Sequence, residues 1–559
     1  MLPQARSSLV PLAVALLAAC GKDGPAEPVG GAFTLGQSLA VESGREARVL
    51  GGGSGGTFVA VVVNLGFDSV GKSSYSLRAS GIEAGDSGPF SARVPSLSVA
   101  RSAPVGLTRD EAYESRLRDR ERAELTPRFA SARRPNAISV PALPTSVAVG
   151  DVVTINVNAE DACINAIRHP VRVVAIGSKA LILVDTLNPP LTPTQAFSAA
   201  DYQRFAARFD TLVYPMDVAA FGEPTDIDKN GRIAIVFTRA VNELTPRNSS
   251  SYVGGLTFSR DLFPVIGTPR ASACATSNEG EFFYIMAPDP NGVINGNQRS
   301  KAFVDSSSTG VIAHELVHLI NASRKLYVNT AAPKFEEKWL DEGLAHEAEE
   351  LLFYREAGLS PRSNITYQTL ISSTRIRNAY RNDMLGNQGR LRDYLASPAD
   401  GSPYRAGDSL STRGAAWSLL RYLVDRTSTS DGTVWSRLVN NTAVGVANLQ
   451  SVFGDVAPLL RDWTVSNVMD DAPAASTELS QKSWNWHSIF GGVDGIAALY
   501  PLPVTAMLPT TPTYSGTVVP GGAAYFTFAV PTDGTATLTL GGQSGAASSN
   551  LQLVIVRTK

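Results

Sequence analysis

The chain has 559 residues, with 49 basic and 51 acidic side chains and a formal net charge of −2. This near balance lacks the basic excess of a nucleic-acid-binding protein, so nucleic acid is excluded as an expected partner. The apolar content of 43% is that of a globular protein, and the length suits about two to four domains.

The first 19 residues read as an export signal. Arg6 precedes an apolar run over residues 9–19, which is too short to span a bilayer, and Cys20 follows at once. The ending "LAAC" resembles a bacterial lipoprotein signal, which implies a lipid on Cys20 after cleavage in front of it. Gly21 in place of aspartate then suggests sorting to the outer membrane. We expect a protein of the bacterial cell envelope, lipid-anchored, or an extracellular one; the alternative is an ordinary signal cut nearby.

Beyond Cys20 the chain has two further cysteines, Cys163 and Cys274. Two thiols in an exported chain form a candidate disulfide, because the compartment is oxidising. The spacing alone does not show that they meet.

Changes in composition divide the chain. Residues 20–32 are rich in glycine and proline and predict a flexible tether. Short apolar runs between glycine turns predict a small β-sandwich over 33–104. A charge-dense stretch over 105–136 predicts an exposed helix or a processing-sensitive linker. Alternating residues over 506–559 predict a second β module, and the remaining 137–505 forms the central domain.

The central domain has strand-like segments first and helical segments after them. "PVRVVAIG", "ALILVD" and "RIAIVFT" are β-branched runs, whereas "TGVIAHELVHLINASRK" and "RGAAWSLLRYLVDR" have helical patterns. This order predicts the α+β class, with a sheet lobe followed by a helical lobe.

The stretch "HELVH" predicts a metal site on a helix. His314 and His318 are four residues apart, so both side chains lie on one helical face and can bind one ion. Glu315 lies about 100° round the helix, beside such an ion. Zn²⁺ lowers the pKa of a bound water to about 7, and a glutamate in this place can take its proton as a general base. The alternative is a buried apolar helix with satisfied histidines.

A third ligand is needed, and the metzincin pattern does not supply it. That pattern requires glycine where Asn321 stands and histidine near Arg324. A second helix, "WLDEGLAHEAEE", places Glu342, His346 and Glu349 on one face. A carboxylate from this face would complete a site with an open position for water. The alternative is a solvated acidic face.

The blocks "HELVH" and "WLDEGLAHEAEE" resemble the gluzincin metallopeptidases, and the longer run over about 140–430 resembles their hyicolysin-like branch. The resemblance implies a zincin-type catalytic domain that hydrolyses peptide bonds. It implies Zn²⁺ at His314, His318 and Glu342, with Glu315 as the general base. Asp341 stands where many gluzincins have asparagine.

The choice of Glu342 over His346 as third ligand rests on position. In the gluzincin pattern the ligand carboxylate comes directly before a glycine, as Glu342 does before Gly343, and a small residue there lets two helices approach closely. His346 lies about 6 Å further along the helix axis, and we expect it, with Glu349, to contact the ligands rather than the metal.

The stretch "DIDKNGR" has the oxygen spacing of half a calcium loop. Asp226, Asp228 and Asn230 are the candidate Ca²⁺ ligands. Phe237 occupies the twelfth position, where an EF-hand needs glutamate, so a full EF-hand is excluded. An Asx-rich turn without a metal explains the stretch equally well.

Two features remain open. The group that stabilises the oxyanion or donates a proton to the leaving amine is expected downstream, and the candidates are Tyr367, Tyr380, Tyr404 and His487. "NEGEFFYI" is either the sheet edge that pairs with an extended substrate or an ordinary core strand.

The sequence favours an exported zinc endopeptidase whose partners are protein or peptide substrates and, through Cys20, a membrane. The alternatives are an aminopeptidase of the same type and a surface adhesion lipoprotein with a relic metal site. A retained Glu315 beside the histidines argues against the relic.

Overall fold

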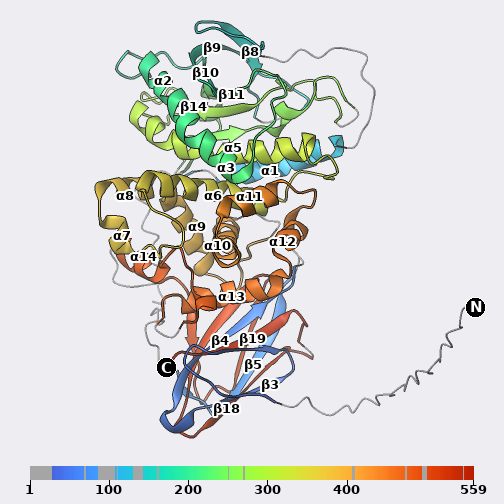
Figure 1. The fold of residues 1–559 in the computed structure, drawn as a ribbon, viewed down its shortest axis with the longest axis vertical. Coiled ribbons are helices and arrows are strands. Elements are labelled where there is room, and N and C mark those ends of the chain that lie inside the picture. The colour runs from blue at the N-terminus through green and yellow to red at the C-terminus, as the bar shows by residue number, and fades with distance from the viewer. Residues whose placement is uncertain are drawn as a thin grey trace, which may run out of the picture.

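The computed structural model describes residues 28–67, 71–85, 108–109, 111–129, 143–159, 163–249, 251–268, 271–405, 409–472, 475–493, 500–545 and 547–559. The molecule is elongated and has three tiers (Figure 1): a mixed sheet with its helices, a layer of helices, and a β-sandwich. Its class is α+β, as expected. The predicted export signal and Cys20 lie outside the described residues.

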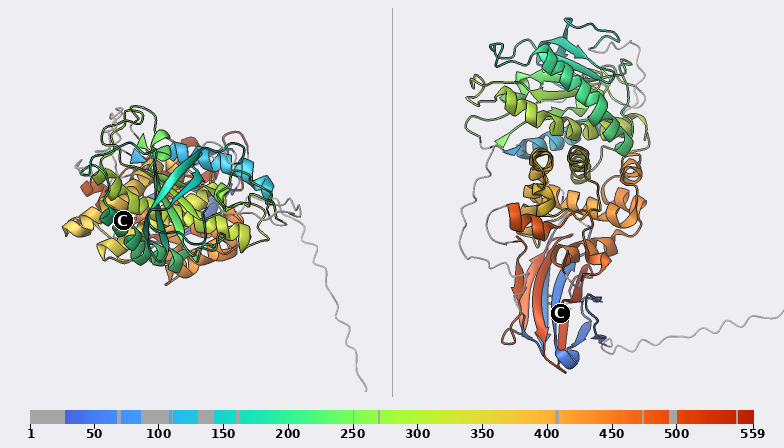
Figure 2. Two further views of the ribbon diagram at one scale, coloured as in Figure 1. Left: turned by 90° about the horizontal axis from the view of Figure 1, so that it is seen from above. Right: turned by 60° about the vertical axis from the view of Figure 1, so that its left-hand side comes forward.

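The sandwich is built from both ends of the chain. Its strands are β1 Val29–Ala32, β2 Ser38–Glu42, β3 Glu46–Leu50, β4 Gly56–Asn64, β5 Ser73–Ser80, β6 Glu83–Ala84, β15 Val504–Ala506, β16 Thr513–Val518, β17 Ala523–Val530, β18 Thr535–Gly541 and β19 Leu551–Arg557. One sheet has the order β1-β3-β18-β5-β16, and the other has the order β15-β17-β4-β19-β2, with β6 paired to β17. Figures 1 and 2 show the two ends interleaved as blue and red strands.

This arrangement corrects the expectation of a separate β module at each end of the chain. β4 pairs with β17 from Gly56↔Val530 to Val63↔Ala523, and on its other side with β19. Each end therefore supplies the neighbours that the other end's strands need for their backbone hydrogen bonds. The expected tether is also shorter, because Val29–Ala32 pairs in parallel with β3.

The strand β4 is apolar on both faces, and its alternate side chains enter two different cores. One face points into the sandwich, and the other belongs to the core that it shares with the helical tier. The first set is Phe58, Ala60 and Val62, and the second is Val59, Val61 and Val63. The Tyr525 hydroxyl also donates to the Thr464 carbonyl in the helical tier, at 2.8 Å.

The sheet of the central domain has the strand order β13-β14-β11-β10-β9-β8. The strands and helices of this part of the domain, in chain order, are β8 Val152–Asn156, β9 Arg168–Ile176, β10 Ala180–Asp185, α2 Ala199–Arg208, a π-helical turn Phe209–Val213, α3 Tyr214–Phe221, β11 Ile233–Thr238, α4 Arg239–Glu243, β12 Ser251–Tyr252, β13 Gly255–Thr257 and β14 Phe282–Met286. The strands β10, β11 and β14 run parallel, and β13 pairs antiparallel with β14 at the edge. The "NEGEFFYI" strand, β14, is therefore not the edge strand, because β13 covers it.

The helical tier follows. It comprises α5 Lys301–Tyr327, α6 Lys338–Ala357, α7 Tyr367–Ile371, α8 Thr374–Ala379, a π-helical turn Tyr380–Met384, α9 Leu385–Leu395, α10 Leu410–Thr427, α11 Asp431–Val439, α12 Gly445–Phe453, α13 Val456–Met469 and α14 Trp486–Val493. Among the described residues, no helix combines the length and apolar character needed to cross a bilayer.

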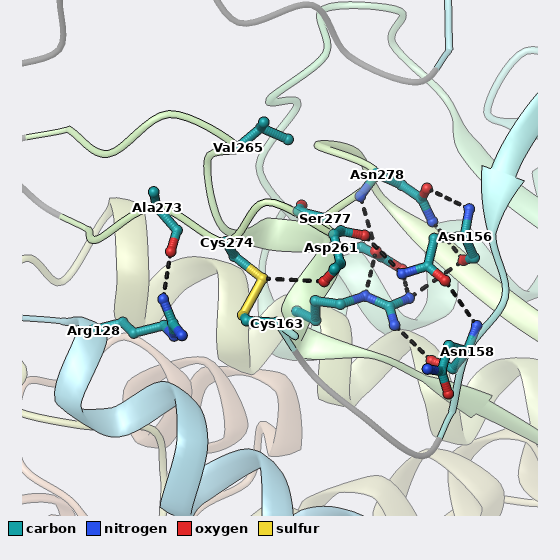
Figure 3. Close-up of a disulfide and its surroundings, with 12 residues drawn as sticks. Arg128, Asn156, Asn158, Cys163, Asp261, Val265, Ala273, Cys274, Ser277 and Asn278 are labelled. Carbon is teal, nitrogen blue, oxygen red and sulfur yellow. Dashed lines mark hydrogen bonds and ion pairs between the residues drawn. A yellow bond between two sulfur atoms is a disulfide. The ribbon is translucent and has the colours of Figure 1, made fainter. Parts of the chain in front are cut away.

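A disulfide joins Cys163 to Cys274 across 111 residues, with an S–S distance of 2.09 Å. Figure 3 shows it beside a buried polar network that includes Asn156 and Asn278. The Asn156 backbone N–H donates to the Asn278 side chain at 2.8 Å, and the Asn156 amide donates to the Thr276 carbonyl at 2.7 Å. The bridge therefore ties the end of β8 to the loop that leads into β14.

Candidate metal centre

The helices α5 and α6 lie side by side and carry the site. α5 begins after Ser300, whose hydroxyl accepts from the Phe303 N–H at 3.1 Å, so an N-terminal donor is satisfied. His314 and His318 lie in its middle and are buried. α6 ends at Gly358, which has the left-handed φ of 70° common after a helix.

Three side-chain atoms converge between the two helices. His314 Nε2 and His318 Nε2 are 3.1 Å apart, and Glu342 Oε2 lies 3.5 Å from the first and 3.8 Å from the second. Two ligands at about 2.1 Å from a tetrahedral zinc are about 3.4 Å apart, so these separations fit one Zn²⁺. Both carboxylate oxygens of Glu342 are buried; Oε2 pairs with Arg413, and Oε1 accepts no hydrogen bond within the described part of the chain. The donor set and its geometry therefore suit a zinc ion.

The other nitrogen of each histidine faces a carboxylate. His314 Nδ1 lies 3.0 Å from Glu349 Oε1, and His318 Nδ1 lies 2.9 Å from Asp341 Oδ2. The Asn321 amide donates to the second oxygen of Asp341 at 2.7 Å. Such partners fix the ring orientation and leave Nε2 free to bind a metal.

His346 lies away from the convergent atoms, one turn along α6. Its Nδ1 is 3.1 Å from Glu349 Oε2, so this carboxylate bridges His346 and His314. Burial, with a smaller contribution from Arg390, lowers the pKa of His346 to about 3, which keeps the imidazole neutral. These three residues are also close enough to hold a metal, but there the Glu349 carboxylate already binds both imidazoles.

Glu315 faces the edge strand of the sheet. Its Oε2 accepts the Thr257 backbone N–H at 2.8 Å, and its own carbonyl accepts the Thr257 hydroxyl at 3.0 Å. Thr257 is the last residue of β13, so the strand edge and the general base that the sequence predicts are held together.

Two arginines contact the carboxylates of the site. Arg118 Nη2 lies 3.3 Å from Glu315 Oε2, and Arg413 Nη1 lies 2.8 Å from Glu342 Oε2. Burial opposes ionisation of Glu342, yet Arg413 and then His318 hold its pKa well below the ordinary value. The carboxylate is therefore negative and able to bind a cation.

Arg118 belongs to α1 Glu111–Leu125, which lies between the sheet and the helical tier (Figures 1 and 2). With α1 in place the site is closed, because the exposed fractions are 0% for His314, 1% for Glu315, 3% for His318 and 0% for Glu342. The charge-dense stretch predicted as an exposed helix or a linker thus contains a helix whose Leu117, Arg118 and Glu121 are buried.

Gly343 lets two helices approach closely, as expected, and these helices are α6 and α10. A Cβ at this position would lie 2.9 Å from Leu420 Cδ1 and 3.4 Å from Ala416 Cβ, and both residues are in α10. The small residue therefore admits α10 against α6, on the side where Arg413 enters the site. The possibility of a solvated acidic face is wrong, since Glu342, His346 and Glu349 are buried.

The four residues considered for proton donation or oxyanion stabilisation have partners elsewhere. The Tyr380 hydroxyl donates to Gln388 Oε1, and the Tyr404 hydroxyl donates to the Gly66 carbonyl in the sandwich. His487 stacks on Tyr500 with ring centroids 3.8 Å apart. The Tyr367 ring lies against Gly492.

The predicted calcium stretch forms an Asx turn that meets a residue distant in sequence. Asp226 Oδ1 accepts the Gly231 N–H, and Asn230 Oδ1 accepts the N–H of Arg232. Carboxylate oxygens of Asp226, Asp228 and Glu281 lie within 4.8 Å of one another. The Asn230 amide instead donates to Asp228 Oδ2.

Sequence reasoning missed Arg118, Arg413 and Glu281. Arg118 is hidden in a segment with five arginines over 116–128, where the pattern of charge suggests solvent exposure. Arg413 follows Ser-Thr in a helix without a recognisable motif. The only available signal was the density of charge before the blocks that contain the histidines and Glu342.

No protein-family model matches the chain. The neutral metalloprotease ShpI of Staphylococcus hyicus is 29% identical over 202 residues, which is 34% of this chain and 41% of that protein. This similarity supports a metallopeptidase. The match covers less than half of that relative's length. The buried histidine and glutamate groups agree with a metal ion in the protein.

Proposed function

We propose that the protein is an exported zinc endopeptidase of the gluzincin type, with a zincin-type catalytic domain within 137–505. The observation that carries the proposal is the convergence of His314 Nε2, His318 Nε2 and Glu342 Oε2 beside the carboxylate of Glu315. The similarity to a neutral metalloprotease supports the same reaction class.

Each residue has a separate task. A zinc ion in this site would polarise a scissile carbonyl and acidify a water molecule. Glu315 would accept the proton of that water and pass it to the leaving amine. The Thr257 N–H, 2.8 Å from Glu315 Oε2, holds the carboxylate in one orientation. The carboxylate would therefore not need to reorient during the reaction.

The edge strand β13 is a suitable place for an extended substrate. Its outer side carries the Thr257 carbonyl, which in this structure accepts a hydrogen bond from Arg118 Nη1 at 2.9 Å. A peptide added to this edge would place a carbonyl near the convergent atoms. We propose protein or peptide substrates on this basis.

The test is digestion of a denatured protein mixture with and without a chelator, followed by mass spectrometry of the cleaved bonds. Internal cuts that disappear with chelator and with Glu315→Gln support an endopeptidase. Trimming of single N-terminal residues would indicate an aminopeptidase. No chelator-sensitive cutting, by the whole chain or by variants with α1 displaced, would support a surface binding lipoprotein instead.

The location is a separate proposal. We propose that a lipid on Cys20 anchors the protein to the bacterial envelope, on the strength of the "LAAC" ending. Cys20→Ser should release the protein into the aqueous phase on detergent partitioning. Wild-type protein that already partitions into that phase would contradict the anchor.

A further inference from the structure

We propose that Asp226, Asp228 and Glu281 hold a calcium ion at the start of β11 and β14. One carboxylate oxygen from each residue lies within 4.8 Å of the others. Oxygens on opposite sides of a Ca²⁺ ion, at about 2.4 Å each, lie about 4.8 Å apart at most, so one ion can bridge the three. We call these three residues the loop cluster.

Glu281 is the residue that points to a ligand. Its side chain is 2% exposed, and its Oε1 accepts the Ile227 N–H at 3.0 Å and the Thr225 hydroxyl at 3.2 Å. Its Oε2 is buried and receives no hydrogen bond within the described part of the chain. Leaving a buried carboxylate oxygen unpaired is costly, and a cation would offset that cost.

The loop cluster has no compensating side-chain charge in the described part of the chain. Among the described residues, no lysine or arginine forms an ion pair with Asp226, Asp228 or Glu281. Burial, followed by repulsion within the cluster, raises the pKa of Asp228 to about 6 and that of Glu281 to about 8. All donors are oxygens, which suits Ca²⁺ better than a softer ion, and carbonyls or water can supply the rest of its coordination.

The backbone of the loop shapes the space around these three carboxylates. Lys229 has a φ of 59°, and Gly231 has a φ of 68°, so the loop turns sharply between its two aspartates and β11. A Cβ on Gly280 would lie 3.1 Å from Asp228 Oδ2, so this glycine keeps room beside the carboxylate.

The ion would tie the metal-bearing helix to the sheet. The Thr225 N–H donates to Ser323 Oγ in α5 at 3.3 Å, and Glu281 precedes the strand β14 that pairs with β11. Calcium at the loop cluster would therefore stabilise the loop that contacts the C-terminal half of α5.

The test is titration of the calcium-stripped full chain with Ca²⁺ by calorimetry, together with thermal melting. Wild type should bind one ion and melt several degrees higher with calcium. Glu281→Gln and Asp228→Asn should bind at least tenfold more weakly and lose the rise in Tm. Asp151→Asn is the matched control, because Asp151 also accepts a backbone N–H in an exposed turn, that of Ala148.

Equal calcium affinity in wild type and Glu281→Gln, or no binding by wild type, would overturn the proposal. If Glu281→Gln does not fold, the exposed Asp226→Asn takes its place with the same expectation. Neither readout needs peptidase activity.

A different set of contacts carries a second inference: we infer that α1 is an autoinhibitory segment. This inference rests on the proposed function. Arg118 places its guanidinium 3.3 Å from Glu315 Oε2 and 3.9 Å from Glu342 Oε1, and all three side chains are buried. The guanidinium therefore lies beside both the proposed base and the proposed third ligand.

The helix α1 also occupies polar groups at the sheet edge. Arg118 donates to the Thr257 carbonyl, and the Ser259 N–H donates to Glu121 Oε1 at 2.6 Å. The segment before α1, Thr108–Arg109, adds a short parallel strand to β12. These are backbone positions that an extended substrate at β13 would use.

Ion pairs with the helical tier hold α1 in place. Arg413 Nη1 lies 2.8 Å from Glu114 Oε2, and Lys338 Nζ lies 2.7 Å from Asp119 Oδ1. Arg413 also contacts Glu342, so departure of α1 would remove its contact with Glu114 and leave the contact with Glu342 in place.

The test compares Arg118→Ala with Arg116→Ala, an exposed arginine on the same helix. Arg118→Ala should cleave a protein substrate several-fold faster and release zinc to a chelator several-fold faster. Arg116→Ala should match wild type. Addition of a synthetic peptide covering residues 108–129 should reverse both changes.

Slower cleavage by Arg118→Ala, with zinc release unchanged, would overturn the inference, because Arg118 would then assist catalysis. Leu117→Asp, which places a charge at a buried position of α1, is the second variant and should also speed both processes. Zinc release reports on closure even in a protein without peptidase activity, so failure of the two proposals can be told apart.

Discussion

Two buried groups of acidic residues in the central domain differ in how their charge is balanced. At the metal centre, Arg118, Arg413 and Arg390 lie within 4 Å of the carboxylates of Glu315, Glu342 and Glu349. At the loop cluster, no such cation is present among the described residues. Both groups nevertheless lie in the central domain, and the 223–232 loop of the second contacts α5, which carries the histidines of the first.

The consequence is visible in the acidity of the two groups. Despite burial, the pKa of Glu342 is held well below the ordinary value, chiefly by Arg413. Burial and like charge instead raise the pKa of Glu281 to about 8. A charged neighbour thus keeps a buried carboxylate ionised and able to bind a metal. In the loop cluster, burial of the carboxylates costs free energy until a cation binds.

The largest effect is expected from Glu342→Ala. Loss of the only carboxylate among the three convergent atoms of the described site should abolish both zinc retention and peptidase activity. Metal analysis of the dialysed protein and a cleavage assay measure these two losses. Glu356→Ala, near the other end of α6, is the control and should retain both.

Glu315→Gln should remove activity but not zinc. The amide keeps the shape of the side chain but cannot accept the proton, and a general base contributes about 10²–10⁴-fold in rate. The cleavage rate and the zinc content of the same sample provide the measurement. Zinc lost along with activity would place Glu315 among the ligands and contradict its role as base.

Arg413→Met would make the metal centre resemble the loop cluster. Without zinc, the variant leaves Glu114 and Glu342 without this partner, and the free energy of unfolding should fall by about 3–5 kcal/mol. With zinc the loss should be smaller, because the ion offsets the charge of Glu342. Denaturant unfolding with and without zinc measures both values.

The matched control is Arg437→Met, on the exposed side of α11. It should change the free energy of unfolding little in either state. An equal loss for Arg413→Met with and without zinc would show that Arg413 does not balance the charge that the metal takes up.

A smaller effect is expected from Glu349→Gln. Glu349 orients His314 through Nδ1, and replacing such a partner typically lowers metal affinity by about 10–100-fold. His346→Ala should keep the metal with some loss of rate. Competition with a fluorescent zinc chelator ranks the variants. A His346→Ala protein without zinc, beside a loaded Glu342→Ala, would reverse the assignment of the third ligand.

Sequence patterns predict the part of the site that lies on two helices. His314, Glu315 and His318 are linked by helical periodicity, and the block around Glu342 is recognisable as a whole. Arg118 and Arg413 are not predictable in this way, because each reaches the site from a separate element and no spacing relates them to the histidines. For the same reason, Glu281 was not paired with Asp226.

The fold shows the same limit. Alternation predicts strands at both ends of the chain, but periodicity within a strand carries no information on its partner. β4 lies between β17 and β19, which follow it by more than 450 residues. Its unbroken apolar run was a signal of burial on both faces, and this argues for a larger host than a small isolated module.

The interleaved sandwich makes the central domain an insertion between two halves of a host domain. Contacts between residues so far apart raise the contact order of the host, and such topologies fold slowly because the loop must close before the pairing stabilises it. β4 cannot gain either neighbour until β17 and β19 have been synthesised. A chain that lacks its last 40 residues would therefore lose the partners of its first strands as well. The strands from the two ends of the chain thus depend on the same pairing step.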